Sequence, residues 1–353
     1  MFLSGLTIRN VRNITNSTIA ADKGINVLIG ENAAGKTTFL ESIDILSRGR
    51  SFRTNRVADL VLKGSDGLYV GGVVGDEKTK LEIKKGGGGT KIFLNGREAK
   101  KQSEITEKIA VQCIHPASHL IIDGPPSERR SFVDWGLFHV EPPYKVSWTA
   151  YSKALKQRNE ALKRAPSEAD AWEDKLVSEG NVIDEMRKEY VKKVRNHFEL
   201  IRPQILPEIP LSMEYQQGWP EGISLSEAIK KTKKTDQERG STQYGPHHAD
   251  LALRINGEDA QRIISRGQQK ILANIMLIAQ AKDFYDKRQD PSIILVDELS
   301  AELTLEMQEK VLERLIETGS QIFISALYDS ILADILSETG AKMFHVEHGE
   351  IAE

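Results

Sequence analysis

Short runs of apolar residues with strand character dominate the first part of the chain. These runs are Leu6–Val11, Ile25–Ile29 and Leu68–Val74. A hairpin is predicted over Lys91–Glu98, because its Asn95-Gly96 pair favours the tight turn of a hairpin. The glycine run Gly86–Gly89 is expected to form a flexible tip between two strands. The pattern therefore predicts a strand-rich region at the start of the chain.

The pattern changes to charged sequence with helical spacing from about Ser127 to Phe198. Three prolines, Pro203, Pro207 and Pro210, are expected to break helices after it, and the lysine-rich stretch 230–234 is expected to be solvated. Helical spacing returns in a long helix predicted from Gly267 to about Phe284. A separate helical region is therefore predicted in the middle of the chain.

Sheet-forming sequence returns towards the end. Ser292–Val296 is a continuous apolar run, typical of a buried parallel strand, and the final strand candidate is Gln321–Ser325. We predict an α/β ATPase lobe built from residues 1–120 and 290–353, with a mostly helical lobe inserted at residues 121–289.

The stretch after Ile25–Ile29 is a P-loop pattern, because it follows a strand and opens an amphipathic helix. Its residues are Gly30, Glu31, Asn32, Ala33, Ala34, Gly35, Lys36 and Thr37, followed by Thr38. Gly30 and Gly35 leave room for backbone N–H groups to meet a phosphate at the helix N-terminus. Lys36 is predicted to reach the β- and γ-phosphates, and the Thr37 hydroxyl to bind Mg²⁺. A plain glycine-rich turn is the alternative.

Two acids, Asp297 and Glu298, follow the strand Ser292–Val296. Open α/β sheets place ligand-contacting groups at the carboxyl ends of their strands. Asp297 is therefore predicted to orient Mg²⁺ through water and Glu298 to polarise the attacking water, with Lys36 as the third catalytic residue. The alternative is a strand that ends in solvated acids.

A second helix N-terminus with phosphate-binding character lies at Ser265, Gly267 and Gln268. Alone, this Ser-x-Gly-Gln pattern is also a helix cap. One γ-phosphate cannot sit at two helix starts of a compact lobe, so we expect two chains to enclose two nucleotides, each P-loop facing the partner's Ser-x-Gly-Gln. Together with the P-loop and the acidic pair, this pattern indicates an ABC-type ATPase.

Motifs over nearly the whole chain resemble the RecF family, whose ATPase head is similar to that of SMC proteins. They are Leu6–Asn13, Gly49–Arg53, Gly124–Arg130 with Asp134-Trp135, Gly245-Pro246-His247 and Ser265–Lys270. The resemblance implies ATP and Mg²⁺ as cofactors, an ATP-dependent homodimer, and binding to DNA with gaps or single-strand/double-strand junctions. It also implies slow, weakly DNA-stimulated ATP hydrolysis that releases the dimer, and cooperation with RecR and RecO in loading RecA during recombinational repair, replication-fork maintenance and SOS induction.

The resemblance also carries residue roles. It assigns Gly30–Thr38 to the nucleotide loop, Ser265, Gly267 and Gln268 to the signature, and Asp297 with Glu298 to the Walker B pair. Gln112 lies where ABC proteins often use a glutamine to sense Mg²⁺ and water, although a strand-end glutamine is the equal alternative. Another ABC/SMC-like ATPase, such as a nuclease-associated one, and the motor subunit of a membrane transporter are the competing classes.

Several positions depart from the family pattern. Thr304 replaces the usual Asp after Walker B, Ala117 follows Pro116 where an acid is common, and His248 replaces a Lys or Arg. No switch histidine follows Ser325. These differences predict weaker turnover more than weaker nucleotide binding.

The predicted DNA contacts are Arg48, Arg50, Arg53 and Arg56, in one loop after the P-loop helix. Arg53 is alternatively a charge clamp for the nucleotide. Basic residues from Lys84 to Lys101 and from Lys153 to Arg164 are further candidates, or ordinary solvated faces. Without a recognition helix or zinc module, we expect structure-selective contacts to the DNA backbone.

Composition agrees with two globular domains. The 353 residues carry a formal charge of −3, which argues against indiscriminate coating of nucleic acid, and Cys113 is the single cysteine, which excludes an intrachain disulfide. The sequence has no apolar run of membrane-spanning length and no signal peptide pattern at its start, so we expect a cytoplasmic protein without a membrane partner.

Overall fold

The computed structural model describes residues 1–353 except 55, 300–302, 328–335, 337–338 and 353. The chain divides into two compact units. Unit 1 contains Met1–Ser118 and Phe284–Glu353, and unit 2 contains His119–Asp283. Unit 1 is thus assembled from both ends of the chain, with limits close to the predicted residues 1–120 and 290–353.

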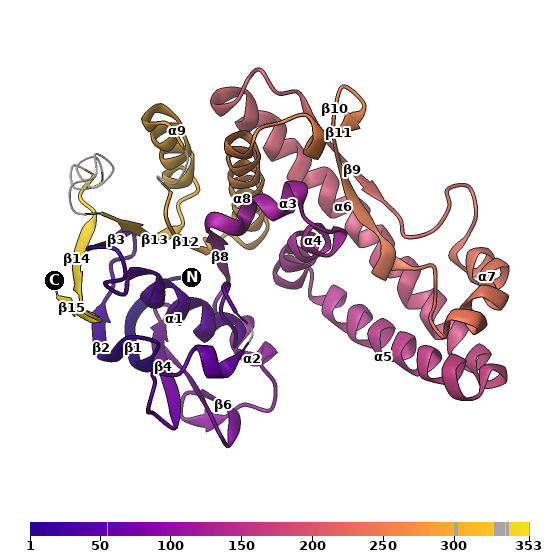
Figure 1. The fold of residues 1–353 in the computed structure, drawn as a ribbon, viewed down its shortest axis with the longest axis horizontal. Helices are drawn as coiled ribbons and strands as arrows, with labels where there is room; N and C mark the ends of the chain where they lie inside the picture. Colours follow the sequence, from indigo (N-terminus) through magenta and orange to yellow (C-terminus); the bar gives the residue numbers. More distant parts are fainter. Residues whose placement is uncertain (55, 300–302, 328–335, 337–338, 353) are drawn as a thin grey trace. The chain divides into compact units, whose positions relative to one another are not determined.

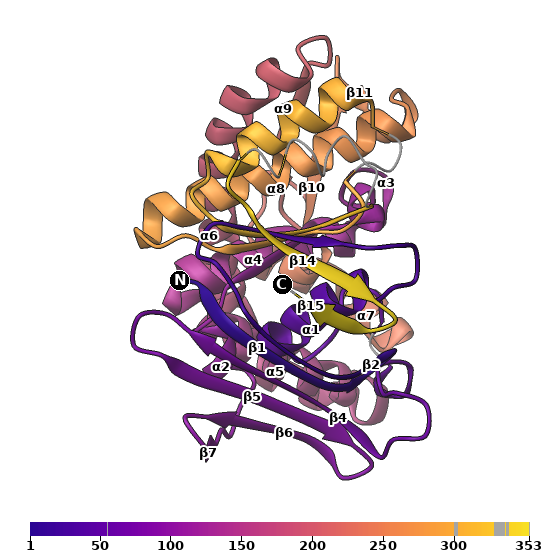
Figure 2. The same ribbon diagram turned by 90° about the vertical axis from the view of Figure 1, so that its left-hand side faces the viewer.

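An antiparallel sheet forms one layer of unit 1, with the strand order β2-β1-β4-β5-β6-β7 (Figure 2). Its strands are β1 (Leu3–Val11), β2 (Ile14–Ala20), β4 (Gly67–Val74), β5 (Thr79–Gly86), β6 (Gly89–Leu94) and β7 (Arg97–Glu98). The predicted hairpin is confirmed: β6 and β7 pair, and Asn95 and Gly96 between them have φ of 51° and 77°, as a two-residue turn with left-handed residues requires.

A second, mainly parallel sheet has the order β15-β14-β3-β13-β12-β8. Its strands are β3 (Ile25–Ile29), β8 (Val111–Ile114), β12 (Ile293–Val296), β13 (Gln321–Ala326), β14 (Lys342–Glu347) and β15 (Glu350–Ala352). The predicted Gln321–Ser325 is therefore not the final strand, because β14 pairs in parallel with β3 and turns back into β15. The order places the end of β13 between the ends of β3 and β12.

Helix α1 (Lys36–Arg48) lies between the two sheets of unit 1, and α9 (Leu305–Ile316) covers the other face of the parallel sheet (Figure 1). The apolar side chains of α1, such as Phe39 and Leu46, join the core formed by both sheets. Because α1 packs between the two sheets, ten of its thirteen residues are buried. The helix that begins at the P-loop is therefore held rigidly on two sides.

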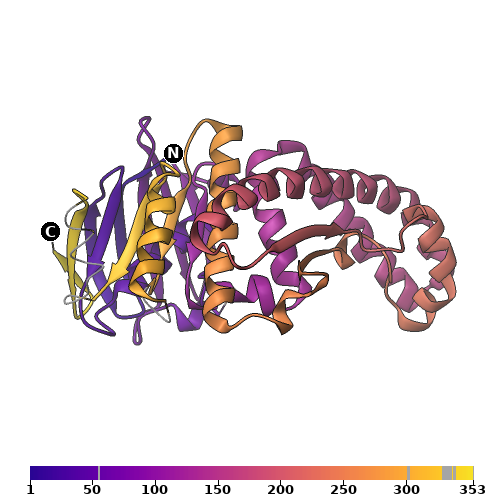
Figure 3. The same cartoon turned by 90° about the horizontal axis from the view of Figure 1, so that it is seen from above.

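Unit 2 is mostly helical, and its long helices run beside each other (Figure 3). Its main helices are α4 (Pro126–Val140), α5 (Pro142–Arg164), α6 (Glu173–Ile205), α7 (Leu225–Arg239) and α8 (Arg266–Arg288, which ends in unit 1). A three-stranded sheet, β11-β10-β9, accompanies them, with β9 (Leu211–Gln216), β10 (Asp250–Ile255) and β11 (Glu258–Asp259).

One sequence prediction in unit 2 is wrong, and another is confirmed, because the four lysines of the stretch 230–234 are exposed. Pro203 does not break a helix: it lies in the last turn of α6, which ends at Ile205, where few bonds remain to be lost. The lysine-rich stretch 230–234 lies within α7, which begins with a capping box between Ser224 and Glu227. The lysines are strong helix formers, so solvation and helix formation coexist there.

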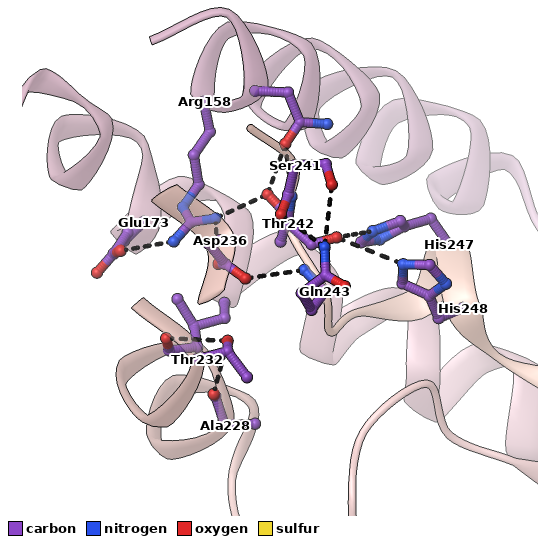
Figure 4. Close-up of polar contacts among 12 residues, drawn as sticks. Arg158, Glu173, Ala228, Thr232, Asp236, Ser241, Thr242, Gln243, His247 and His248 are labelled. Carbon is purple, nitrogen blue, oxygen red and sulfur yellow. Dashed lines mark hydrogen bonds and ion pairs between the residues drawn. The ribbon is translucent and has the colours of Figure 1, made fainter. Parts of the chain in front are cut away.

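The Gly245-Pro246-His247 motif belongs to a buried polar network in unit 2 (Figure 4). His247 Nε2 contacts the Thr242 carbonyl at 3.1 Å and Nδ1 contacts the Tyr151 hydroxyl at 2.6 Å. Since a carbonyl only accepts, Nε2 carries the hydrogen and Nδ1 accepts from Tyr151. Nearby, the buried Arg158 donates to Asp236 and Thr242, at 2.7 Å each. The motif therefore fixes the connection between α7 and β10.

Candidate nucleotide-binding site

A cavity of about 840 Å³ in unit 1 collects residues from both chain ends. It is lined by Arg12, Asn13, Asn32, Ala33, Gly35, Lys36, Thr37, Thr38, Arg53, Asp59, Val61, Lys63, Asp297, Glu298, Ser325, Ala326 and Leu327. Its volume lies within the range of ordinary ligand sites. The predicted P-loop and the predicted acidic pair thus meet in one place.

The P-loop connects β3 to α1, as predicted. Gly35 has φ of 126°, which disfavours any other residue. Gly30 has a different requirement: a Cβ there would lie 2.3 Å from the Val346 carbonyl oxygen, so its glycine also permits the close approach of β14. Lys36 Nζ donates to the carbonyls of Gly30 and Glu31, at 2.7 and 2.8 Å. Burial lowers the pKa of Lys36.

Asp297 forms the polar centre of the opposite wall. Its Oδ1 accepts from the Thr37 hydroxyl at 3.0 Å and from the Ser325 hydroxyl at 2.9 Å. Burial raises the pKa of Asp297, opposed by these two hydrogen bonds. The exposed Glu298 has φ of 55° and its N–H donates to Ser325 Oγ. A non-glycine residue in this conformation is strained, a feature that concentrates at functional sites.

Thr37 and Asp297 offer a hydroxyl and a carboxylate oxygen within hydrogen-bond distance of each other. This pair fits Mg²⁺, which prefers oxygen ligands and keeps several waters. No group of three or more His, Cys, Asp or Glu with metal-binding geometry occurs among the described residues. The arrangement therefore suits a cation shared with phosphate oxygens rather than one enclosed by protein.

The β1–β2 turn braces the P-loop, which the sequence did not predict. Asn13 Nδ2 donates to the Ala33 and Ala34 carbonyls, and Asn13 Oδ1 accepts from the Thr38 hydroxyl at 2.8 Å. Arg12, with φ of 48°, also lines the cavity. Arg12 and Asn13 end the Leu6–Asn13 motif of the family resemblance, to which the sequence analysis gave no role at the nucleotide loop.

The buried Glu41 of α1 holds two arginines at this cavity. Arg12 Nη2 donates to its carboxylate at 2.7 Å, and Arg53 Nη1 lies 3.8 Å from it. Ser51 Oγ donates to the same carboxylate and accepts from the Arg53 N–H. Because Arg53 lines the cavity, its alternative role as a charge clamp on phosphates has geometric support.

The other predicted DNA-contacting arginines differ in their surroundings. Arg48 donates twice to Asp44, at 2.6 Å each, on its own helix. Its guanidinium is thus committed to a structural ion pair, which does not support the predicted DNA contact. Arg50 and Arg56 are exposed and remain predictions.

The position of Gln112 does not support its predicted role at Mg²⁺. Gln112 lies inside β8, pairs with Ile294, and its Oε1 accepts from Ser292 at 3.4 Å. Asp297 is three residues beyond Ile294, about 10 Å along the strand. His115, the first residue after β8, lies at the Asp297 end, since Asp297 N–H donates to the Ile114 carbonyl. Its ring packs on Phe52.

The signature residues lie in unit 2, at the start of α8. The Ser265 N–H donates to Gln268 Oε1 at 2.9 Å, and the Gln268 N–H donates to Ser265 Oγ at 3.3 Å. The helix-cap reading is therefore confirmed. The cap leaves Ser265 exposed, so a cap and a phosphate contact are compatible.

Thr304 caps α9, because its Oγ1 accepts from the Met307 N–H at 3.4 Å. An Asp at this position would form the same cap and add a charge. The replacement therefore preserves local structure and removes only the carboxylate. The neighbouring Ala301 and Glu302 lie outside the described residues.

Within the described part of the chain, no helix combines the length and the apolar character needed to cross a bilayer.

Comparison with known proteins matches the whole chain. The family described as RecF/RecN/SMC N terminal domain matches residues 2–352. The DNA replication and repair protein RecF of Vibrio campbellii is 34% identical over 357 residues, covering 99% of this chain and 100% of that protein. RecF of Nitrosococcus oceani is 33% identical over 363 residues, covering 100% and 99%.

Solved structures give the same result. The recombination mediator protein RecF with ATP, described in the RecFOR pathway, has a TM-score of 0.87 and 25% identity and covers 99% of this chain and 97% of that chain. An Smc head bound to the C-terminal winged helix domain of ScpA has a TM-score of 0.59, 17% identity and coverage of 99% and 96%. The second similarity shows the shared fold alone.

Proposed function

This chain belongs to the RecF family of ABC/SMC-type ATPases, and we propose that it dimerises on ATP and binds gapped DNA or single-strand/double-strand junctions. In this proposal it promotes RecA loading with RecR and RecO, in recombinational repair, replication-fork maintenance and SOS induction. Slow ATP hydrolysis, weakly stimulated by DNA, releases the dimer in the cytoplasm.

The observation that carries the proposal is the convergence of P-loop, Thr37, Asp297 and Glu298 on one cavity. Lys36 exchanges its two backbone carbonyl partners for phosphate oxygens, which a charged donor binds more strongly. Thr37 and Asp297 hold Mg²⁺, which when bound neutralises charge on the β- and γ-phosphates. Glu298 orients and polarises the attacking water.

Two protomers complete the proposed site. The exposed N-terminus of α8, with Ser265, Gly267 and Gln268, presents N–H groups and a positive helix end to the γ-phosphate bound by the partner's P-loop. The cap formed by Ser265 and Gln268 keeps Ser265 Oγ at this end of α8. ATP, but not ADP, then joins the two chains.

The first test is the mass in solution by light scattering with Mg²⁺-ATP, with ADP and with neither, each with and without gapped DNA. We expect a dimer with Mg²⁺-ATP but not with ADP or without nucleotide, and we expect gapped DNA to favour this dimer further. A monomer under every condition would overturn the composite site. Phosphate release with and without gapped DNA measures the proposed stimulation.

Two variants separate nucleotide binding from dimerisation. Lys36→Ala is expected to abolish both, so an ATP-dependent dimer of this variant would refute the role of Lys36. Ser265→Arg is expected to bind ATP as a monomer. Ser265→Ala is its control, because both lose the Ser265 cap, worth about 1 kcal/mol, while only the arginine blocks the partner's phosphate. Equal dimerisation of both would refute the sandwich.

A further inference from the structure

A row of basic side chains crosses the outer face of the antiparallel sheet. Arg9 of β1 pairs with Tyr69 of β4, Tyr69 with Lys84 of β5, and Lys84 with Lys91 of β6. These four strands lie side by side (Figure 2). Directly paired residues point to the same face of a sheet, so three cations from separate parts of the sequence stand in one line. We call Arg9, Lys84 and Lys91 the basic row.

The charges of the basic row are not neutralised. Among the described residues, no carboxylate forms an ion pair with Arg9, Lys84 or Lys91, and all three are exposed. By contrast, Arg12 and Arg48 of the same unit are paired with buried acids. A protein with nearly balanced overall charge that leaves three aligned cations unpaired offers a local attraction for a polyanion.

Aromatic rings position two of these cations, Arg9 and Lys84. Arg9 lies 5.5 Å and Lys84 5.8 Å from the centre of the Tyr69 ring, and Lys84 is 5.1 Å from that of Phe93. Tyr69 is itself fixed, since its hydroxyl donates to Glu82 at 2.7 Å. Contacts of this kind restrict long side chains, so less entropy is lost when a ligand binds them.

The row borders an open groove. The next row of paired residues on the same face is Gly67, Gly86 and Gly89, none of which has a side chain. The groove has a volume of about 670 Å³, and Asp66 and the glycine tip also line it. Added Cβ atoms at Gly87 or Gly88 would contact nothing within 4 Å. The tip therefore leaves space for a chain lying along the row.

We propose that the basic row binds the phosphate backbone of DNA, an inference that rests on the proposed function and assigns it a surface. The row spans three strand spacings, about 14 Å, which equals the axial length of about four base-pair steps of a duplex. The residues that line this groove belong to strands and turns, and none of them lies in a helix that could enter a DNA groove. The contacts are therefore made to the backbone, in keeping with binding governed by DNA structure rather than sequence.

The test compares two variants with the same change in net charge. Arg9→Gln/Lys84→Gln/Lys91→Gln removes the row, and Lys78→Gln/Lys108→Gln/Arg288→Gln removes three exposed cations of the same unit that lie outside the groove and outside the candidate DNA contacts. Affinity is measured with Mg²⁺-ATP for a short duplex, its single strand and a gapped duplex, over a series of salt concentrations. ATP affinity and thermal unfolding are measured alongside as checks on folding.

Removal of the row is expected to weaken DNA binding about tenfold or more at physiological salt. It is also expected to reduce the slope of log affinity against log salt by about 2 to 3, since a phosphate contact contributes about 0.9 in a duplex and 0.7 in a single strand. The form of DNA with the larger loss is the one that lies on the row. The control variant is expected to keep the wild-type slope.

A second pair of variants avoids changing the row. Gly88→Asp places a negative charge at the tip, where the structure has space for it, and Gly88→Asn has the same shape without the charge. We expect only the aspartate to weaken DNA binding. Equal salt slopes of the row and control variants, or equal effects of Asp and Asn at Gly88, would refute the basic row as the DNA-binding surface but would leave the proposed function standing. A wild-type protein that binds no DNA with ATP would overturn the proposed function as well.

Discussion

Asp297→Asn is expected to stabilise the nucleotide-free protein and to abolish its ATPase activity. The carboxylate of Asp297 is buried, and burial together with the neighbouring Glu298 raises its pKa. An amide keeps Oδ1 as the acceptor for Thr37 and Ser325 and removes the buried charge. Stabilising single substitutions commonly add 0.5–2 kcal/mol, and we expect about 1 kcal/mol here. Hydrolysis is lost because the amide is a poor Mg²⁺ ligand.

Asp44→Asn provides the matched control on the adjacent helix α1. Asp44 is also buried, but Arg48 binds both of its oxygens at 2.6 Å. Removing one partner of a buried ion pair costs about 3–5 kcal/mol, and the partial exposure of Arg48 places this variant near about 3 kcal/mol. The same substitution should therefore change stability in opposite directions at the two sites.

The sign of the pH dependence provides an independent check. When folding raises the pKa of a carboxyl group, the free energy of unfolding falls as the pH rises. The loss begins near the pKa of the group in the unfolded chain, about 3.9, and is complete above its pKa in the folded protein. The difference between Asp297→Asn and wild type is thus expected to be absent in acid and to open as the pH rises. Below about pH 4 the two proteins should unfold alike.

Thermal and urea unfolding of both variants without nucleotide measure these differences, and 1 kcal/mol corresponds to about 2–4 °C for a domain of this size. If Asp297→Asn unfolds at a lower temperature than wild type at neutral pH, the buried charge of Asp297 is not a source of strain. Retained Mg²⁺-dependent phosphate release by the variant would contradict its place at the cation.

Two further predictions concern the family motifs. Thr304→Asp is expected to keep the cap of α9 and to raise ATP turnover several-fold, measured as phosphate release. Thr304→Asn is the control, because it keeps the cap without adding the charge. Equal turnover of the two variants would show that the missing carboxylate does not limit hydrolysis. Burial lowers the pKa of His247 to about 4. The neutral ring therefore adds to the free energy of unfolding in full above about pH 6.5, and up to about 3 kcal/mol of this stability is lost as the pH falls towards 4. Urea titrations at pH 7 and pH 5 measure this loss, and a His247→Gln variant with the same pH dependence as wild type would assign it to another group.

The sequence was sufficient for features encoded by neighbouring residues. The P-loop follows from an apolar strand, two glycines and a helix, and the structure places them at Ile25–Ile29 and Lys36–Arg48. The run that ends in Asp297 follows from uninterrupted apolar character, which both of its parallel neighbours explain. In each case the local pattern and the burial require the same element.

Features that depend on strand order were beyond the sequence. Ser325 contacts Asp297 because β13 lies between β3 and β12, and Arg12 reaches the cavity because the β1–β2 turn meets the P-loop. Gln112 was misplaced for the same reason: its distance from Asp297 depends on the register of β8 against β12, and a difference of two residues moves a side chain by about 7 Å. Pairing register also creates the basic row, whose members are separated in sequence and become neighbours only in the sheet. The residues proposed to hold a nucleotide were therefore visible as motifs, whereas the contacts that position these motifs form between segments distant in the sequence.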